Sequence, residues 1–364
     1  MRSFVKKYFP LFSLLFFVLF AITALLWYIS SINPIFADLI VSGAGYVMRR
    51  ALSALTEFTS FSLMEPIFII GIILLVASVV RVFSRERSSA AVIRKLVGVV
   101  SLFAFLLSVY FYTLGVGYHT TPVYSKLSLE RNGNISTDSL KNTVLILKSE
   151  TEALLDYIEF TDGGASSCSL TQDEISRELC RAYEVLDSEY GGLNLKCFDS
   201  RSKDAVSSKV LVSLQITGIY SFYTGEATVS TSYPDYIIPF TIAHEFAHQR
   251  GIARENEANF MAFLACIRSE SPYIRYSGYL NMIEYLLSSL NRADGEALKE
   301  TYSILDKRII GEMRAYSEFY YANKNELLEK ISRFFNDNYL KAQGTEGIVS
   351  YGMVTELCVS YYGQ

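Results

Sequence analysis

Long apolar runs without charge dominate the first third of the chain and limit what it can fold into. Residues 10–32 contain no charged side chain, and 66–83 and 96–118 are two further apolar runs. Because about 20 helical residues, at about 1.5 Å each, cross the hydrocarbon core of a bilayer, these lengths predict three transmembrane helices and a lipid bilayer as partner. A cleaved signal peptide is the alternative for the first run, but that run is long and lacks a small-x-small exit.

Basic side chains indicate which ends of these runs face the cytoplasm. They precede the first run and fill the loop between the second and third: Arg2, Lys6, Lys7, Arg85, Arg87, Arg94 and Lys95. The positive-inside rule places both groups in the cytoplasm, so the N-terminus is predicted to be cytoplasmic and the chain after residue 118 extracytoplasmic. Arg49 and Arg50, in the predicted outer loop, oppose this orientation. The amphipathic stretch 37–61 is expected to lie along the outer membrane surface.

From His119 onward the composition becomes that of a globular domain. Thr171 and Glu174 form a capping-box pattern ahead of a helix. Residues 210–229 hold alternating and β-branched residues, broken by Gly218 and Gly225, which predicts a short sheet. We therefore expect a membrane region over 1–118 and a helix-rich α+β domain over 119–364. Further helices are expected at about 240–250, 253–268, 275–290, 296–322 and 325–336.

Charge and cysteine content exclude two classes of function. The net charge is −4 and no basic run is interleaved with aromatic residues, so no nucleic-acid partner is predicted. None of the five cysteines forms a Cys-x-x-Cys pair, which argues against a cysteine zinc cluster. Cys168, Cys180 and Cys197 are close enough in sequence for one disulfide outside the cell, and buried free thiols are the alternative.

Two of the three histidines stand four residues apart, in the pattern His-Glu-x-x-His. His244 and His248 share one helical face, close enough for both imidazoles to bind one metal ion. Glu245 is placed to face the metal-bound water and to take its proton as the water attacks a carbonyl. The pattern predicts a Zn²⁺-dependent hydrolase site. An occurrence by chance in a membrane scaffold is one alternative.

Two acidic residues compete to be the third ligand that catalytic zinc usually has. Glu255 shares a helical face with small residues, which lets that face pack closely against the motif helix: Ala258, Asn259 and Ala262. Glu257 shares its face with residues typical of a core: Phe260, Met261 and Leu264. Glu255 is the preferred ligand, and Glu257 remains the alternative. Asn259 is expected to hydrogen-bond a ligating histidine.

Residues Glu255, Ala258 and Asn259 resemble the Glu-x-x-Ala-Asp/Asn signature of gluzincin-type metallopeptidases. That resemblance implies His244, His248 and Glu255 as zinc ligands, Glu245 as the general base and Asn259 as a hydrogen-bond partner behind the ligands. Arginine cannot ligate, and Arg254 stands where the pattern HExxHxxGxxH has its third histidine, so that subclass is disfavoured.

A longer stretch, residues 239–260 together with 275–279, resembles a bacterial membrane family known as a domain of unknown function. Its architecture is three N-terminal transmembrane helices and an extracytoplasmic HExxH domain. The resemblance implies a zincin-like, membrane-anchored zinc metallopeptidase that hydrolyses peptide bonds of a peptide or protein outside the cytoplasm. A non-catalytic zinc-binding membrane sensor or structural protein that retains the fold is the alternative, and the intact Glu245 argues against it.

Weaker expectations concern substrate binding. A strand upstream of the motif helix often binds substrate backbone in such peptidases, and residues 225–230 are the candidate. Arg275, Tyr276, Tyr279 and Tyr351 are candidates for stabilising the oxyanion. His119 is expected to be a solvated or interfacial histidine and not a metal ligand.

Overall fold

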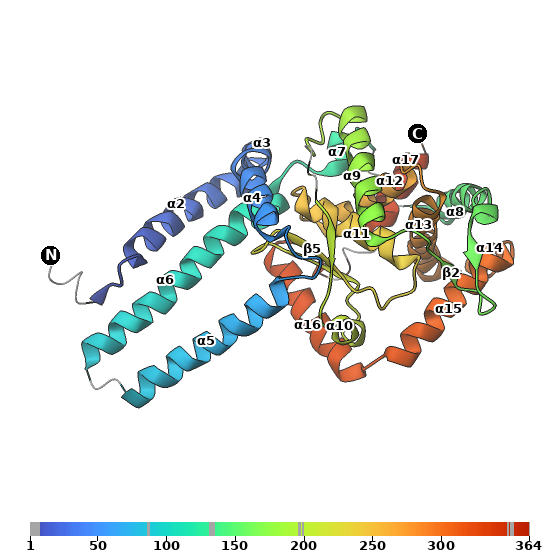
Figure 1. Cartoon of the computed structure of the whole chain (residues 1–364). Helices are drawn as coiled ribbons and strands as arrows, with labels where there is room; N and C mark the ends of the chain where they lie inside the picture. Colours follow the sequence, from blue (N-terminus) through green and yellow to red (C-terminus); the bar gives the residue numbers. More distant parts are fainter. Residues whose placement is uncertain are drawn as a thin grey trace.

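The computed structural model shows three long helices that extend from one side of a helix-rich domain (Figure 1). They are α2 (Ser13–Ile32), α5 (Met64–Arg85) and α6 (Ser89–Thr113). The structure describes residues 8–85, 88–130, 135–195, 198, 200–347, 349 and 353–363. Within the helical extension α2 and α6 are in contact, and the Ser101 hydroxyl donates a hydrogen bond of 2.9 Å to that of Ser13.

Two of these helices, α2 and α6, are long and apolar enough to cross a membrane, so they could anchor the protein there. The apolar part of α5, Met64–Val80, is shorter. The third apolar run was predicted to extend to residue 118, but α6 ends at Thr113 and the 3₁₀ helix η2 (Gly115–His119) follows. The helix ends there because η2 turns into the domain, where Val116 and Tyr118 are buried.

The segment between α2 and α5 lies against the domain with its polar side inward. It forms α3 (Pro34–Ile40), the π-helix η1 (Val41–Gly45) and α4 (Tyr46–Thr56). Arg49 and Ser53 are buried, whereas Leu39 and Leu55 are exposed. The stretch is amphipathic as expected, and the structure adds that the domain, rather than water, covers its polar side.

Three short strands form the main sheet, in the order β3 (Ser202–Asp204), β5 (Glu226–Val229), β4 (Gly218–Ser221). The central strand β5 runs parallel to β3 and antiparallel to β4. Gly225, at φ +71°, begins the hairpin return, and a Cβ there would lie 2.5 Å from the backbone nitrogen of Ser53. The predicted small sheet is therefore present, although the start of the predicted segment forms a helix, α10 (Ser208–Ser213).

Helices make up the rest of the domain, and the predicted capping box of Thr171 and Glu174 is present at the start of α9. The predicted helix 296–322 is instead two helices, because the Asp306 side chain accepts a hydrogen bond from the backbone N–H of Arg308 and caps a new helix. The helices are α7 (Val123–Lys126), α8 (Thr137–Glu152), η3 (Leu155–Tyr157), α9 (Gln172–Glu189), α11 (Ile237–Gln249), α12 (Glu255–Ile267), α13 (Pro272–Ala293), α14 (Gly295–Ser303), α15 (Lys307–Asn323), α16 (Glu326–Ala342) and α17 (Val354–Tyr362). A second, two-stranded sheet pairs β1 (Glu159–Phe160) with β2 (Ser166–Ser167).

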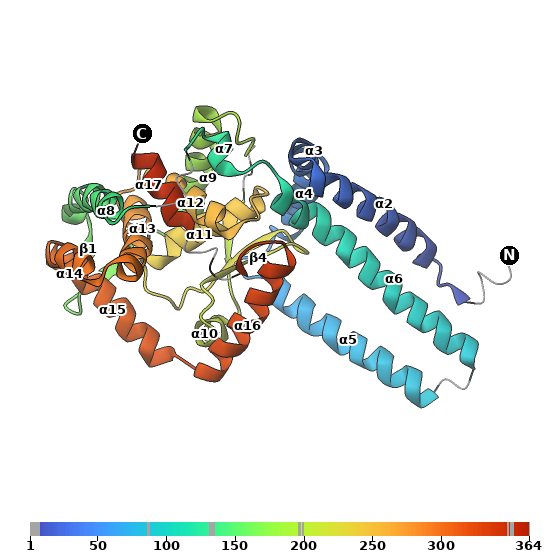
Figure 2. The ribbon, with the colours of Figure 1, turned by 180° about the vertical axis from the view of Figure 1, so that it is seen from behind.

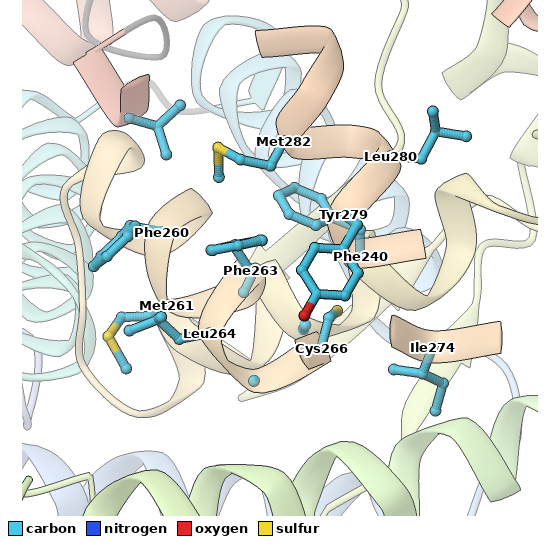
Figure 3. Close-up of a cluster of buried hydrophobic side chains, with 14 of the residues drawn as sticks. Phe240, Phe260, Met261, Phe263, Leu264, Cys266, Ile274, Tyr279, Leu280 and Met282 are labelled. Atoms are coloured by element: carbon cyan, nitrogen blue, oxygen red, sulfur yellow. The ribbon is translucent and has the colours of Figure 1, made fainter. Parts of the chain in front are cut away.

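The hydrophobic core is centred on α11, α12 and α13 (Figure 3). Phe260 and Phe263 of α12 are fully buried, and burying such a side chain stabilises the fold by about 1.5–3 kcal/mol. At Gly278 of α13 a Cβ would lie 2.4 Å from the Cβ of Cys266, so the two helices cross at van der Waals contact. The helix that carries the His-Glu-x-x-His pattern is thus held from several sides, including the sheet.

The described cysteines are free thiols: Cys168, Cys180, Cys266 and Cys358. A disulfide between Cys168 and Cys180 is therefore not formed. Cys197, the third member of the predicted group, lies outside the described residues.

Candidate functional site

Three ligand-type side chains from α11 and α12 point at one another. The Nε2 atoms of His244 and His248 are 3.0 Å apart, with the two rings at 89°. The Oε2 atom of Glu255 lies 3.2 Å from Nε2 of His244 and 3.6 Å from Nε2 of His248. Such a group of ligand atoms, all within 4.8 Å of one another, could hold a metal ion.

A tight glycine turn between the two helices brings Glu255 into this group. Gly251 has φ +98°, and a Cβ there would lie 2.5 Å from Cγ1 of Val41, so the position requires glycine. The backbone N–H of Gly251 donates to the carbonyl of His248 at 2.9 Å. Because α12 begins at Glu255 directly after this turn, the first carboxylate of α12 faces back onto α11.

The orientation of His248 is fixed by its other ring nitrogen. Nδ1 of His248 lies 2.7 Å from the carbonyl oxygen of Ile252. A carbonyl accepts hydrogen bonds, so Nδ1 carries a proton, and Nε2 is the ring nitrogen that faces His244 and Glu255. The ring of Tyr220 stacks on the His248 ring, with centroids 6.4 Å apart.

Charges in the group shift two pKa values in opposite directions. Burial alone would raise the pKa of Glu255, but the two histidines outweigh it and hold the pKa well below its usual range. Burial likewise opposes protonation of His248, but the Glu255 carboxylate outweighs it and raises the pKa of His248 to about 9. The Glu255 carboxylate therefore favours positive charge at this group.

Glu245 is held beside the group, between α11 and the edge strand β4. Its carboxylate accepts a hydrogen bond from the backbone N–H of Tyr220, and burial raises its pKa. At Gly218 a Cβ would lie 2.6 Å from Oε1 of Glu245 and 2.7 Å from Cγ2 of Thr241. Glycine at 218 thus allows the strand to approach the motif helix closely.

The competing acid Glu257 lies elsewhere. One of its carboxylate oxygens accepts a hydrogen bond of 3.0 Å from the backbone N–H of Val123 and one of 3.1 Å from Arg254. The guanidinium of Arg254 also donates to the carbonyls of Tyr118 and Thr120, at 2.8 Å each. The structure therefore brings Glu255, and not Glu257, together with the histidines.

A cavity of about 1010 Å³ opens over the group, at the upper end of the range for ligand pockets. Its floor carries His244, Glu245, His248 and Glu255. Strand β4 lines it, α13 contributes Glu284 and Tyr285 among others, and residues of α15 and α16 complete the lining. The space is large enough for a segment of extended peptide.

Sequence comparison places the chain in a family. A family model described as a protein of unknown function (DUF3810) matches residues 43–359. The chain belongs to the DUF3810 family. No curated protein and no solved structure matches it.

In this DUF3810 member the cavity does not include the three predicted oxyanion candidates of α13. Tyr276 is fully buried, and its hydroxyl donates to Oε2 of Glu312 at 3.0 Å. Tyr279 lies in the core against Phe263, with ring centroids 6.0 Å apart (Figure 3). Arg275 is likewise absent from the cavity lining, because α13 reaches the cavity only further along, from Asn281. Tyr351 lies outside the described residues.

Three further expectations are corrected or refined. Residues 225–230 were predicted to form the substrate-binding edge strand, but β5 is central, and the edge that lines the cavity is β4. Asn259 lines the cavity, yet in the described part of the chain it makes no hydrogen bond to either histidine. His119 lies apart from the group and accepts a hydrogen bond of 2.8 Å from the indole of Trp27 at the end of α2.

Sequence reasoning missed the tyrosines of the cavity wall: Tyr118, Tyr220, Tyr233, Tyr285, Tyr316, Tyr320 and Tyr339. The chain has 26 tyrosines, and nothing in their spacing separates these from the rest. They come from separate segments that only the folded chain brings together.

Proposed function

We propose that this protein is a membrane-anchored zinc metallopeptidase that hydrolyses peptide bonds outside the cytoplasm. The observation that carries the proposal is the convergence of His244, His248 and Glu255 beside Glu245, on the floor of one large cavity. A purely structural metal site has no need of Glu245, nor of a cavity above it.

The donor set fits zinc. Two imidazole nitrogens and one carboxylate are ligands that catalytic zinc takes, with a further position left open. Ligand atoms about 2.0–2.1 Å from a tetrahedral ion lie about 3.3–3.4 Å apart, and the separations here are 3.0, 3.2 and 3.6 Å. The open side of the group faces the cavity.

Bound zinc would supply Lewis-acid chemistry, making a water molecule acidic and polarising the substrate carbonyl. Glu245 takes the proton from the attacking water and passes it to the departing amine. The backbone N–H of Tyr220 holds the Glu245 carboxylate in place beside the ligand group.

The cavity walls provide for the peptide itself. Strand β4 (Gly218–Ser221) is an edge strand among the residues that the structure describes, so its free side can add an extended peptide as a further strand. Tyr285 is our candidate for stabilising the oxyanion in place of the residues predicted from the sequence. Burial, together with the charge of Glu255, raises the pKa of Tyr285, so its hydroxyl remains a hydrogen-bond donor.

The placement of the domain outside the cytoplasm is part of the proposal. The domain contacts the C-terminal ends of α2 and α6 and the N-terminal end of α5. Three crossings in this arrangement put the N-terminus and the domain on opposite sides of the membrane. A reporter fused after Gln364 should be active outside the cytoplasm, and a cytoplasmic signal would overturn this topology.

The catalytic proposal is tested with the full-length protein, its metal content measured and peptide hydrolysis followed. We expect one zinc per chain in wild type and in Glu245→Gln, with hydrolysis by Glu245→Gln reduced about 10²–10⁴-fold. Glu255→Gln should lose the metal, whereas Glu257→Gln, which removes the same charge from the same helix, should keep it. If Glu245→Gln binds zinc and cleaves like wild type, the peptidase proposal fails.

A further inference from the structure

Helix α16 carries a stripe of apolar side chains that no described part of the chain covers. Leu327, Ile331, Phe334 and Phe335 are 67%, 41%, 65% and 68% exposed. Their spacing of four, three and one residues places them on one side of the helix. Single exposed apolar residues are common, but a continuous stripe with two phenylalanines marks a contact surface.

Hydrogen bonds fix the level of α16 relative to the apolar helices. The hydroxyl of Tyr339 in α16 lies 3.2 Å from that of Tyr110, in the last turn of α6. Figures 1 and 2 show α16 running across the direction of α5 and α6 and not along it. If α6 crosses a bilayer, α16 lies along the membrane surface at the level where α6 leaves it.

Exposed apolar residues recur at this level on other elements. The backbone N–H of Ser207 donates to the carboxylate of Glu65, in the first turn of α5, at 3.2 Å. The neighbouring Val206 is exposed. Helices α3 and α4 expose Ile35 and Leu55 on their outward face, whereas the polar side of these two helices faces the domain. These surfaces adjoin the exposed apolar sides of α2, α5 and α6, so one occupant, lipid, would cover them all.

We propose that α16 is an interfacial helix whose Leu327–Phe334 face lies in the boundary between headgroups and acyl chains. Lys330 and Lys341 flank this face on the helix surface, from where their long side chains can reach lipid headgroups. Ile331 and Phe335 of the stripe also line the cavity, together with Ser332, Asn336 and Tyr339 of the same helix, so the stripe reaches from the outward-facing Leu327 and Phe334 to the cavity. The cavity therefore lies at the membrane surface. Resting on the proposed peptidase activity, this assigns as substrates polypeptide segments that lie at or emerge from the bilayer.

Fluorescence quenching tests the lipid contact without reference to metal or activity. The full-length protein with Phe334→Trp is reconstituted into nanodiscs whose lipids carry bromine on the acyl chains, and into the same nanodiscs without bromine. Tyr157→Trp is the matched control, because Tyr157 is 72% exposed and follows α8, at the end of the domain away from the apolar helices (Figure 1). Trp27 is present in both proteins and its signal is subtracted using wild type.

Brominated lipid should quench the fluorescence added at position 334 several-fold more than that added at 157. Equal quenching would overturn the proposal. Equal quenching in nanodiscs that each hold two chains would show that a second copy of the chain covers the stripe instead of lipid. Because neither outcome depends on zinc or hydrolysis, failure here is distinct from failure of the peptidase proposal.

The substrate class has its own test. Wild type should cleave a lipid-anchored peptide faster than the same peptide free in solution. The double variant Leu327→Ser with Phe334→Ser should bring that ratio toward one, and neither residue lines the cavity. A wild-type ratio of one, with hydrolysis intact, would overturn the assignment of substrates and leave the peptidase proposal standing.

Discussion

The Lys203–Glu226 pair and the group of His244, His248 and Glu255 are both largely buried, and they differ in how completely they are hydrogen-bonded. Lys203 and Glu226 form an ion pair of 2.9 Å between β3 and β5, with both side chains almost fully buried. Glu226 also accepts hydrogen bonds from the backbone N–H groups of Leu63 (3.0 Å) and Met64 (2.9 Å), where α5 begins. A carboxylate at a helix N-terminus is favourable, so this group joins the sheet to α5.

The group of His244, His248 and Glu255 on α11 and α12 is less completely hydrogen-bonded. Its ligand atoms face one another, and in the described part of the chain Nδ1 of His244 and Nδ2 of Asn259 are buried without a hydrogen-bond partner. It opens onto a cavity, whereas no cavity residue belongs to the Lys203–Glu226 pair. A group closed by the protein's own donors maintains the fold, and one left open toward a cavity can take an exchangeable ion.

The largest expected effect separates the two groups by stability. Lys203→Met leaves the Glu226 carboxylate buried without its cation, which should destabilise the protein by about 3–5 kcal/mol. Thermal unfolding of the full-length protein measures this. Lys299→Met, which removes an exposed partner of Glu296, should change stability by no more than about 1 kcal/mol. Equal effects of the two substitutions would remove the distinction between the closed group and an ordinary surface pair.

The second largest effect concerns the group of His244, His248 and Glu255, where we expect the stability of the protein to depend on a bound metal ion. A ligand that binds only the folded protein, at 100 times its dissociation constant, stabilises it by about 2.7 kcal/mol. A chelator should therefore lower the unfolding temperature of wild type and leave that of Glu255→Gln unchanged. Lys203→Met should retain the full response to chelator despite its lower stability. If the chelator lowers the unfolding temperature of Glu255→Gln as much as that of wild type, the stabilising metal ion does not bind at Glu255.

The parts of the site that the sequence could predict are those built from neighbouring residues. The helix, Gly251 and the start of α12 lie within about twenty residues, and the spacing of His244, His248 and the small residues after Glu255 already defines their shared faces. The order of the sheet could not be predicted in this way, because β5 becomes central only through its pairing with β3, more than twenty residues earlier. The wall formed by α15 and α16 is equally remote in sequence.

The role of Arg49 could not be predicted from the sequence either, because its hydrogen-bond partners are remote in the chain. In the sequence it opposed the predicted orientation, as a cation in an outer loop. In the structure it is buried and donates to the carbonyls of Gln249 (3.0 Å), at the end of α11, and Val41 (2.9 Å). Burial lowers the pKa of Arg49 to about 10, which still leaves it charged at neutral pH. A cation used to cap the motif helix carries no information on topology, and its partner is 200 residues away.

The smallest expected effect concerns Glu284, a half-buried acid in the cavity wall, which lies between the two extremes. Its carboxylate accepts one hydrogen bond, of 3.1 Å, from the Tyr236 hydroxyl, and burial, with the nearby Glu312, raises the pKa of Glu284 to about 7. The folded state then binds more protons than the unfolded state between about pH 4.5 and 7, so stability falls as pH rises through that window. Glu284→Gln should flatten the fall and, relative to its effect at pH 5, gain roughly 1–2 kcal/mol at pH 8. Unfolding temperatures across this range measure it, with the exposed Glu296→Gln as control. If the unfolding temperatures of Glu284→Gln and wild type change with pH in the same way, the charge of Glu284 is as well stabilised in the folded protein as that of Glu226. An acid in the cavity wall would then not differ from one enclosed by the sheet.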